Sequence, residues 1–208
     1  MNRAEKMIPL ILKHEGGFVD HPRDPGGATN KGITIATFRR YIKSNGTVAD
    51  LKALTTAQAT IVYKRQYWDA VVADMLPVGV DYSVADFAVN SGPSRAAKML
   101  QRVVGVTQDG RIGPATLAAV RALPTDFIIR KLNALRLAFM KSIRGGSLWK
   151  TFGRGWQRRV DEVTAQSLAD ARALARPKGS VATPATSTPT PSFWIQLIAA
   201  IMRLFKGK

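Results

Sequence analysis

The 208-residue chain contains no cysteine, and this absence removes several kinds of chemistry at once. Without thiols the chain has no disulfide, no thiolate zinc site and no cysteine nucleophile, so we expect it to fold alike in reducing and oxidising compartments. Long apolar runs are also scarce: in the opening MNRAEKMIPLILKHEGG a glutamate follows the first basic residue and the apolar run stops after six residues. This is not the pattern of a secretory signal peptide, so we expect synthesis in the cytoplasm without a leader.

Acidic residues are scarce in the second half of the chain. Residues 1–92 carry 11 basic and 9 acidic side chains, residues 93–175 carry 15 and 5, and residues 176–208 carry 5 and none. The resulting net charge of +17 attracts polyanions such as nucleic acid, anionic lipid or anionic cell-wall polymer, unless it only solvates the surface. Because the sequence has no helix-turn-helix, RNA-recognition or zinc-finger pattern, we do not expect nucleic acid as a partner.

Alternating runs of β-branched residues are missing too, which predicts a mainly α fold with at most a small hairpin, around residues 28–34. Pro9 should kink the first helix or mark the place near which it properly begins, and Thr55 or Thr56 should cap the third. Apolar spacing and Gly or Pro stop signals predict helices over residues 1–15, 34–45, 55–70, 81–90, 94–104, 114–122, 124–144 and 154–174.

The end of the chain has a different composition. Residues 176–192, RPKGSVATPATSTPTPS, are typical of a flexible linker. Residues 193–208, FWIQLIAAIMRLFKGK, have an apolar stretch of ten residues, well short of the roughly 20 that a membrane-spanning helix needs. Their Trp, Phe and basic residues predict an amphipathic helix on an anionic membrane surface; the alternative is a helix that docks on the core or in an oligomer interface.

The stretch KHEGGFVDHPRDPGG, residues 13–27, crowds three carboxylates among glycines and prolines. His14, Glu15 and His21 do not form an H-E-x-x-H motif, so we expect no metal and no cofactor. Glu15 at the end of an apolar helix can stay protonated as a general acid, while Asp24 in a turn can stay ionised. Glycosidic bond hydrolysis needs such a pair, although a helix-terminal Glu and a turn Asp are also common structural features.

Several motifs carry a resemblance to a known family. The run HEGGFVDHPRDPGGATNKGIT resembles the signature of glycoside hydrolase family 108, the N-acetylmuramidases of phages and bacteria. RQYWD, DFAVNSGP and MLQRVVG follow in the family's order, and TQDGRIGPATLAA resembles its predicted peptidoglycan-binding lobe. The resemblance covers roughly residues 3–170. It implies a two-lobed, lysozyme-like helical fold with a catalytic lobe at 1–92 and a peptidoglycan-binding-like lobe at 93–175, before the linker and tail.

The resemblance also implies roles for single residues. Glu15 matches the family's catalytic glutamate and should be the general acid. By similarity to phage-type lysozymes, Asp24 falls at the second carboxylate, with Asp20 as its rival. Thr29 or Asn30 falls where a residue positions the water, and Thr34 continues the hairpin as a further substrate-binding candidate.

Other residues have two interpretations each. Tyr67 and Trp68 can stack on sugar rings or pack in the core, and Asn90 can bind an N-acetyl group or close its helix. Gln101 can line a groove or serve as an internal hydrogen-bond partner. Arg154, Arg158 and Arg159 are expected to face anionic wall polymer or lipid and to take no part in the chemistry.

The sequence thus predicts an endolysin-type muramidase. It would cleave the β-1,4 bond between N-acetylmuramic acid and N-acetylglucosamine, with peptidoglycan glycan strands as partner and a holin as the route to the periplasmic wall. The alternative is a catalytically weak muramidase-fold protein for cell-wall binding or membrane-associated scaffolding.

Overall fold

The computed structural model describes residues 2–20 and 27–175. The predicted second carboxylate Asp24, the linker at 176–192 and the tail at 193–208 therefore lie outside the described residues. Within the described ranges no helix is long and apolar enough to cross a membrane.

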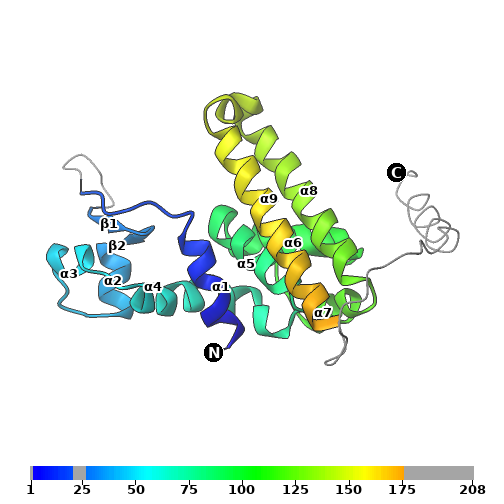
Figure 1. The fold of residues 1–208 in the computed structure, drawn as a ribbon, viewed down its shortest axis with the longest axis horizontal. Helices are drawn as coiled ribbons and strands as arrows, with labels where there is room; N and C mark the ends of the chain where they lie inside the picture. The colour runs from blue at the N-terminus through cyan, green and yellow to red at the C-terminus, as the bar shows by residue number, and fades with distance from the viewer. Residues whose placement is uncertain (1, 21–26, 176–208) are drawn as a thin grey trace, which may run out of the picture. The chain divides into compact units, whose positions relative to one another are not determined.

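Short helices and one hairpin make up the part of the chain before residue 80 (Figure 1). The hairpin pairs Thr29 with Thr34 and Asn30 with Ile33 in antiparallel register. The elements are α1 (Arg3–Leu12), β1 (Thr29–Asn30), β2 (Ile33–Thr34), α2 (Ile35–Tyr41), α3 (Val48–Lys52), α4 (Thr56–Tyr63), a π-helical turn (Lys64–Trp68) and two 3-10 turns (Asp69–Val71 and Ala73–Met75).

Longer helices follow, and α8 and α9 run side by side (Figure 1). These elements are α5 (Val80–Ser91), α6 (Pro93–Val104), α7 (Pro114–Arg121), α8 (Thr125–Ser142), a 3-10 turn (Ile143–Gly146) and α9 (Ser147–Ala175).

The mainly α fold with a small hairpin is confirmed, and every predicted helix is present with shifted ends. Thr55 caps α4 as predicted, because its hydroxyl accepts a hydrogen bond from the Gln58 amide at 3.2 Å. Pro9 lies inside α1 without ending it. Two predictions were inaccurate: the short α3 was not predicted, and α9 begins at Ser147, seven residues before its predicted start at 154.

Helix α1 is fixed to the helices that follow residue 79 by one arginine. Arg3 donates from Nε to Asp81 on α5 and from Nη1 to Asp170 on α9, each at 2.7 Å. Both carboxylates are buried, and burial opposes the charge of Asp170 while Arg3 holds the pKa of that carboxyl below its usual value. Helix α1, which leads to Glu15, is therefore fixed at its first residue to α5 and α9.

A single apolar core extends from Ala4 to Leu168 and includes almost all of α5. It runs through both predicted lobes, 1–92 and 93–175, and that division of the chain stays a prediction. A buried polar cluster crosses the core where Ser83 on α5 contacts Ser167 on α9 at 2.8 Å and accepts from Asn133 on α8 at 3.1 Å.

Gly79, just before α5, brings two helices close together. Its φ is +93°, and a methyl group there would lie 2.4 Å from the Ser167 carbonyl oxygen on α9. Gly105 has a similar φ of +78°, with no atom within 4 Å of an added methyl group.

We expect Gly105→Ala to destabilise the fold by about 1 kcal/mol through backbone strain, and Gly79→Ala by about 3 kcal/mol through strain and overpacking. Urea unfolding measures both, and equal losses would contradict the close approach of α5 and α9.

Candidate active site

Glu15 lies in the turn after α1, where its amide donates to the Leu12 carbonyl at 3.2 Å. Its side chain is 19% exposed. Oε1 accepts a charge-assisted hydrogen bond of 3.0 Å from Nη1 of Arg159 on α9. The carboxyl group is thus partly buried and is held by a residue far away in the sequence.

The hairpin turn packs against the other oxygen of Glu15. Gly32 has a φ of +70°, and a methyl group there would lie 3.2 Å from Glu15 Oε2 and 2.7 Å from the Tyr63 hydroxyl. That hydroxyl donates to the Lys31 carbonyl at 2.8 Å. Glycine is needed here both for its left-handed backbone and for the space it leaves beside the carboxyl group.

Two tyrosines border the same carboxyl group. The rings of Tyr63 and Tyr67 lie 5.3 Å apart. Burial, followed by the negative charge of Glu15, raises the pKa of both phenols above the ordinary value. Both therefore remain neutral hydrogen-bond donors at physiological pH. Tyr67 is half-buried, so one side of it faces solvent.

Arg159 also contacts Asp86, which pairs with Arg136, so that charges of opposite sign alternate from Glu15 into the core. Asp86 on α5 accepts from Arg159 Nε at 3.1 Å and from Arg159 Nη2 at 3.0 Å. Its Oδ1 lies 2.7 Å from Nη2 of Arg136 on α8, and both of these side chains are fully buried. With Glu15 ionised, the order Glu15, Arg159, Asp86, Arg136 alternates in sign and each inner charge is compensated on both sides; with Glu15 protonated, Arg159 keeps Asp86 as its carboxylate partner.

This arrangement keeps the buried groups charged. Burial disfavours the ionised form of Asp86, but the guanidinium groups of Arg136 and Arg159 outweigh it and hold the pKa of the carboxyl below its usual value. Burial likewise opposes the charge of Arg159, whereas Asp86 and then Glu15 raise the pKa of its guanidinium. Arg159 is therefore a permanent cation that fixes Glu15.

His14 is adjacent to this site but has no strong partner. Its Nε2 lies 3.6 Å from an oxygen of Glu162 on α9. Burial and the nearby Arg159 lower the pKa of the imidazole, which is then neutral at pH 7. Among the described residues no group of three or more His, Asp or Glu side chains gathers as metal ligands would.

Three predicted substrate-binding residues lie in the interior instead. Trp68 is 1% exposed and donates from Nε1 to Asp74 at 2.7 Å. Gln101 donates from Nε2 to Asp109 at 2.6 Å and fixes the turn before α7. Asn30 donates to the Leu51 carbonyl at 2.9 Å. Since their polar atoms have internal partners, their predicted contact with sugars has no support in the geometry.

The remaining predicted residues surround the hairpin or end α5. Val19 and Thr29 exchange two backbone hydrogen bonds of 2.8 Å, which sets the exposed Asp20 beside β1. Thr34 caps α2 by accepting from the Thr37 amide at 3.2 Å. Asn90 accepts from the Ser91 hydroxyl at 3.1 Å and is half-buried. The roles predicted for these side chains stay predictions.

Sequence reasoning missed the charges behind Glu15. Arg159 was expected to face an anionic polymer or lipid, but it is buried and points toward Glu15 and Asp86, while Arg154 and Arg158 are exposed. The available signal was an aspartate within the otherwise apolar face of DFAV, since a carboxylate at such a position needs a buried cation.

Comparison with known proteins agrees with this geometry. Residues 8–92 match the family described as Glycosyl hydrolase 108, and residues 95–161 match the one described as Predicted Peptidoglycan domain. No curated protein matches the chain. Among solved structures it is similar to SagA of Brucella abortus, with 50% identity, a TM-score of 0.67, and coverage of 81% of this chain and 95% of that one.

The two matched regions together support a glycosidase that acts on peptidoglycan. The half-buried glutamate, the hairpin and the helical fold are the features that the sequence motifs predicted for such an enzyme. Given these matches and the extent of the likeness to SagA, the chain belongs to glycosyl hydrolase family 108.

Proposed function

We propose that the chain is an N-acetylmuramidase that cleaves the β-1,4 bond between N-acetylmuramic acid and N-acetylglucosamine. The observation that carries the proposal is the fixed, partly exposed carboxyl group of Glu15. Arg159 occupies Oε1, which leaves Oε2 as the oxygen able to carry a proton to the glycosidic oxygen. Proton donation by a positioned carboxyl group is the step that such a leaving group requires.

We assign the second half of the reaction to the stretch of sequence between Val19, which bridges to Thr29, and β1. A carboxylate there would activate water or stabilise the positively charged sugar, with Asp24 as first candidate and Asp20 as second. Thr29, bridged to Val19 beside Asp20, would orient the water. Tyr67, half-buried next to Glu15, would pack against a sugar ring.

The test is hydrolysis of purified peptidoglycan by the full chain. We expect a peptidoglycan suspension to lose turbidity while new reducing ends accumulate in proportion to enzyme. Sedimentation with peptidoglycan without new reducing ends would instead support the alternative, a catalytically weak protein that binds the wall or acts as a membrane-associated scaffold.

We propose further that the enzyme acts as an endolysin on the periplasmic wall, with a holin as its route from the cytoplasm. The excess of basic side chains after residue 93 would favour retention on anionic wall and membrane surfaces. The Trp- and Lys-bearing sequence of residues 193–208 would hold the enzyme at an anionic membrane.

Deleting residues 177–208 tests the role of the tail. The shortened chain should hydrolyse purified peptidoglycan at the parent rate, since Glu15 and its partners all lie before residue 176. Its partition onto vesicles that contain anionic lipid should fall, because the apolar stretch and four basic residues are lost. Co-sedimentation with vesicles measures this, and unchanged partition would contradict membrane attachment through the tail.

A further inference from the structure

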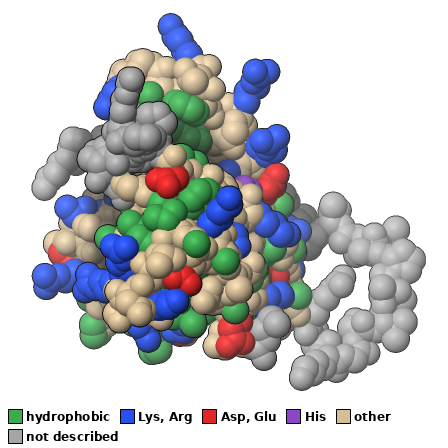
Figure 2. Space-filling model, turned by 90° about the vertical axis from the view of Figure 1, so that its left-hand side faces the viewer, with side chains coloured by type: hydrophobic (Ala, Val, Ile, Leu, Met, Phe, Trp, Pro, Cys, Tyr) green, Lys and Arg blue, Asp and Glu red, His purple; other side chains and the backbone are tan. Residues whose placement is uncertain are grey.

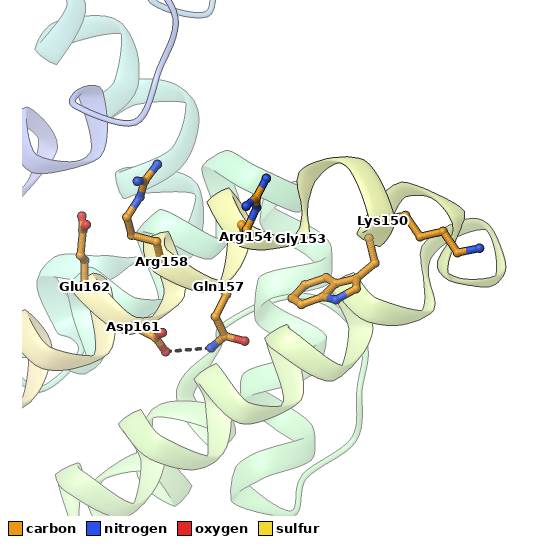
Figure 3. Close-up of a pocket in the computed structure, with 8 residues that line it drawn as sticks. Lys150, Gly153, Arg154, Gln157, Arg158, Asp161 and Glu162 are labelled. Carbon is orange, nitrogen blue, oxygen red and sulfur yellow. Dashed lines mark hydrogen bonds between the residues drawn. The ribbon is translucent and has the colours of Figure 1, made fainter.

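A hollow of about 650 Å³ lies along the first half of α9, apart from the residues assigned to the chemistry. In Figure 3, Arg154 and Arg158 point to one side of the helix, and Gln157 and Asp161 to the other, joined by a hydrogen bond of 2.9 Å. The residues that line it include Trp149, Lys150, Arg154, Arg158, Asp161 and Glu162.

Aromatic rings gather at the end of this hollow. Trp149 and Phe152 lie 6.2 Å and 5.8 Å from Trp156, measured between ring centroids, and Phe152 is 52% exposed. A methyl group at Gly153 would lie 2.7 Å from two atoms of the Trp149 indole, so this ring lies against the helix backbone. Flat, partly exposed rings of this kind pack against the apolar faces of sugars.

The surroundings of the hollow are strongly basic. Residues 127–160 contain nine basic side chains and no acidic one. Apart from Arg136 and Arg159, which are buried in the ion-pair chain, these basic side chains are exposed. Figure 2 shows Lys and Arg side chains projecting from the upper end of the molecule. Figure 1 shows the turn between α8 and α9 at that end. A partner for this surface must carry negative charge.

The hollow also adjoins the candidate active site. Glu162 borders it and lies 3.6 Å from His14, the neighbour of Glu15. Arg158 lines it, and the next residue, Arg159, holds Glu15. From Arg159 to Trp149 the helix rises by about 15 Å. A polymer with its scissile bond at Glu15 can therefore extend along α9 to the aromatic rings.

We propose that this hollow, the α9 groove, binds the peptide-bearing part of a peptidoglycan strand outside the bond that is cleaved. Trp149 would pack against a sugar ring, while Lys150, Arg154 and Arg158 would pair with carboxylates of the stem peptides. The inference rests on the proposed function and deepens it, because it makes the stem peptides part of what the enzyme recognises. Peptide-free glycan would then bind without the contribution of the three basic side chains.

The test compares two triple substitutions, each introduced into the full chain that already carries Glu15→Gln, so that binding is measured without hydrolysis. One also carries Lys150→Gln, Arg154→Gln and Arg158→Gln. The control carries Lys98→Gln, Arg102→Gln and Arg121→Gln, which removes the same charge from exposed positions on α6 and α7, outside residues 127–160. Co-sedimentation with intact peptidoglycan should weaken about tenfold for the first and less than twofold for the control.

A second arm uses chitin, a β-1,4-linked N-acetylglucosamine polymer that has neither stem peptides nor carboxylates, because amidase treatment of peptidoglycan would free the lactyl carboxylate of each N-acetylmuramic acid. There the groove variant should bind as well as the Glu15→Gln parent, whereas Trp149→Ala should bind both substrates more weakly. Equal weakening by the two triple variants, or no weakening by either, would overturn the proposal. Loss of binding to anionic vesicles with intact binding to peptidoglycan would assign the surface to lipid.

The proposed function and this inference are tested by different measurements. If the unaltered chain releases no reducing ends from peptidoglycan, the muramidase assignment is wrong, while the binding comparison between the variants still decides the role of the α9 groove. Thermal unfolding of each variant confirms that the differences in binding come from folded proteins.

Discussion

Glu15→Gln should reduce the initial rate of peptidoglycan hydrolysis by about 10² to 10⁴-fold and leave the fold intact. The glutamine Oε1 can still accept the hydrogen bond that Arg159 now donates at 3.0 Å, so the geometry around the turn is kept. An amide has no proton of comparable acidity to transfer to the leaving oxygen. The rate of release of reducing ends measures the loss, and urea unfolding measures stability.

Glu162→Gln is the matched control for this variant. Glu162 is a carboxylate close to the same site, 3.6 Å from His14, but its side chain is 57% exposed, and although it borders the α9 groove it is not one of the groups assigned to the chemistry or to substrate binding. We expect this variant to hydrolyse peptidoglycan within about threefold of the parent rate, the range of a surface charge change below 1 kcal/mol. A Glu15→Gln chain as active as the parent would exclude Glu15 as the acid.

Asp86→Asn should destabilise the protein by about 3–5 kcal/mol. Asp86 lies between two guanidinium groups and is fully buried, and in the described part of the chain it is the one carboxylate within 4 Å of Arg136. A neutral amide in its place leaves the buried Arg136 without a carboxylate partner and leaves Arg159 with Glu15 alone. Equilibrium unfolding in urea gives the difference directly.

Asp170→Asn is the control for Asp86→Asn. Asp170 also pairs with an arginine, but Arg3 is partly exposed and keeps Asp81 as a second carboxylate partner. The loss should therefore be about 1 kcal/mol, in the range of a partly solvated ion pair. Losses of equal size would mean that burial of the Asp86 pairs has little energetic weight.

The same variant predicts a pH dependence. The pKa of Asp86 is lower in the folded chain than the value of about 3.9 for an unfolded one, so its stabilisation is complete above that pH and is lost as the pH falls through the folded pKa. The stability difference between parent and Asp86→Asn should therefore be largest near pH 7 and shrink below about pH 4. A constant difference from pH 7 to pH 2 would contradict this linkage.

Local signals predicted the helices well, because apolar spacing and caps act within a few residues. Thr55 and Gln58 show this, since the cap and its reciprocal partner are three positions apart. The start of α9 was placed too late because Gly153 was assigned, with Gly145 and Gly146, to the joint between the predicted helices 124–144 and 154–174. In the fold Gly153 stays helical and leaves room for the Trp149 ring, a packing relation that composition does not reveal.

The candidate site was predictable only in part. Glu15 could be identified from its motif. Its partner Arg159, however, lies 144 positions away in the sequence, and Arg159 in turn contacts Asp86, which is 73 positions away from it. No local pattern reports such pairs. For Trp68 the sequence left two interpretations open, a sugar platform and a core residue, and its 1% exposure places the indole in the core.

The most direct measurement is mass spectrometry of peptidoglycan digested by the full chain and reduced with borohydride before analysis. A muramidase leaves its new reducing ends on N-acetylmuramic acid, and we expect these to appear with the parent and to be nearly absent with Glu15→Gln. New reducing ends on N-acetylglucosamine, or none above the background of undigested material, would contradict the account.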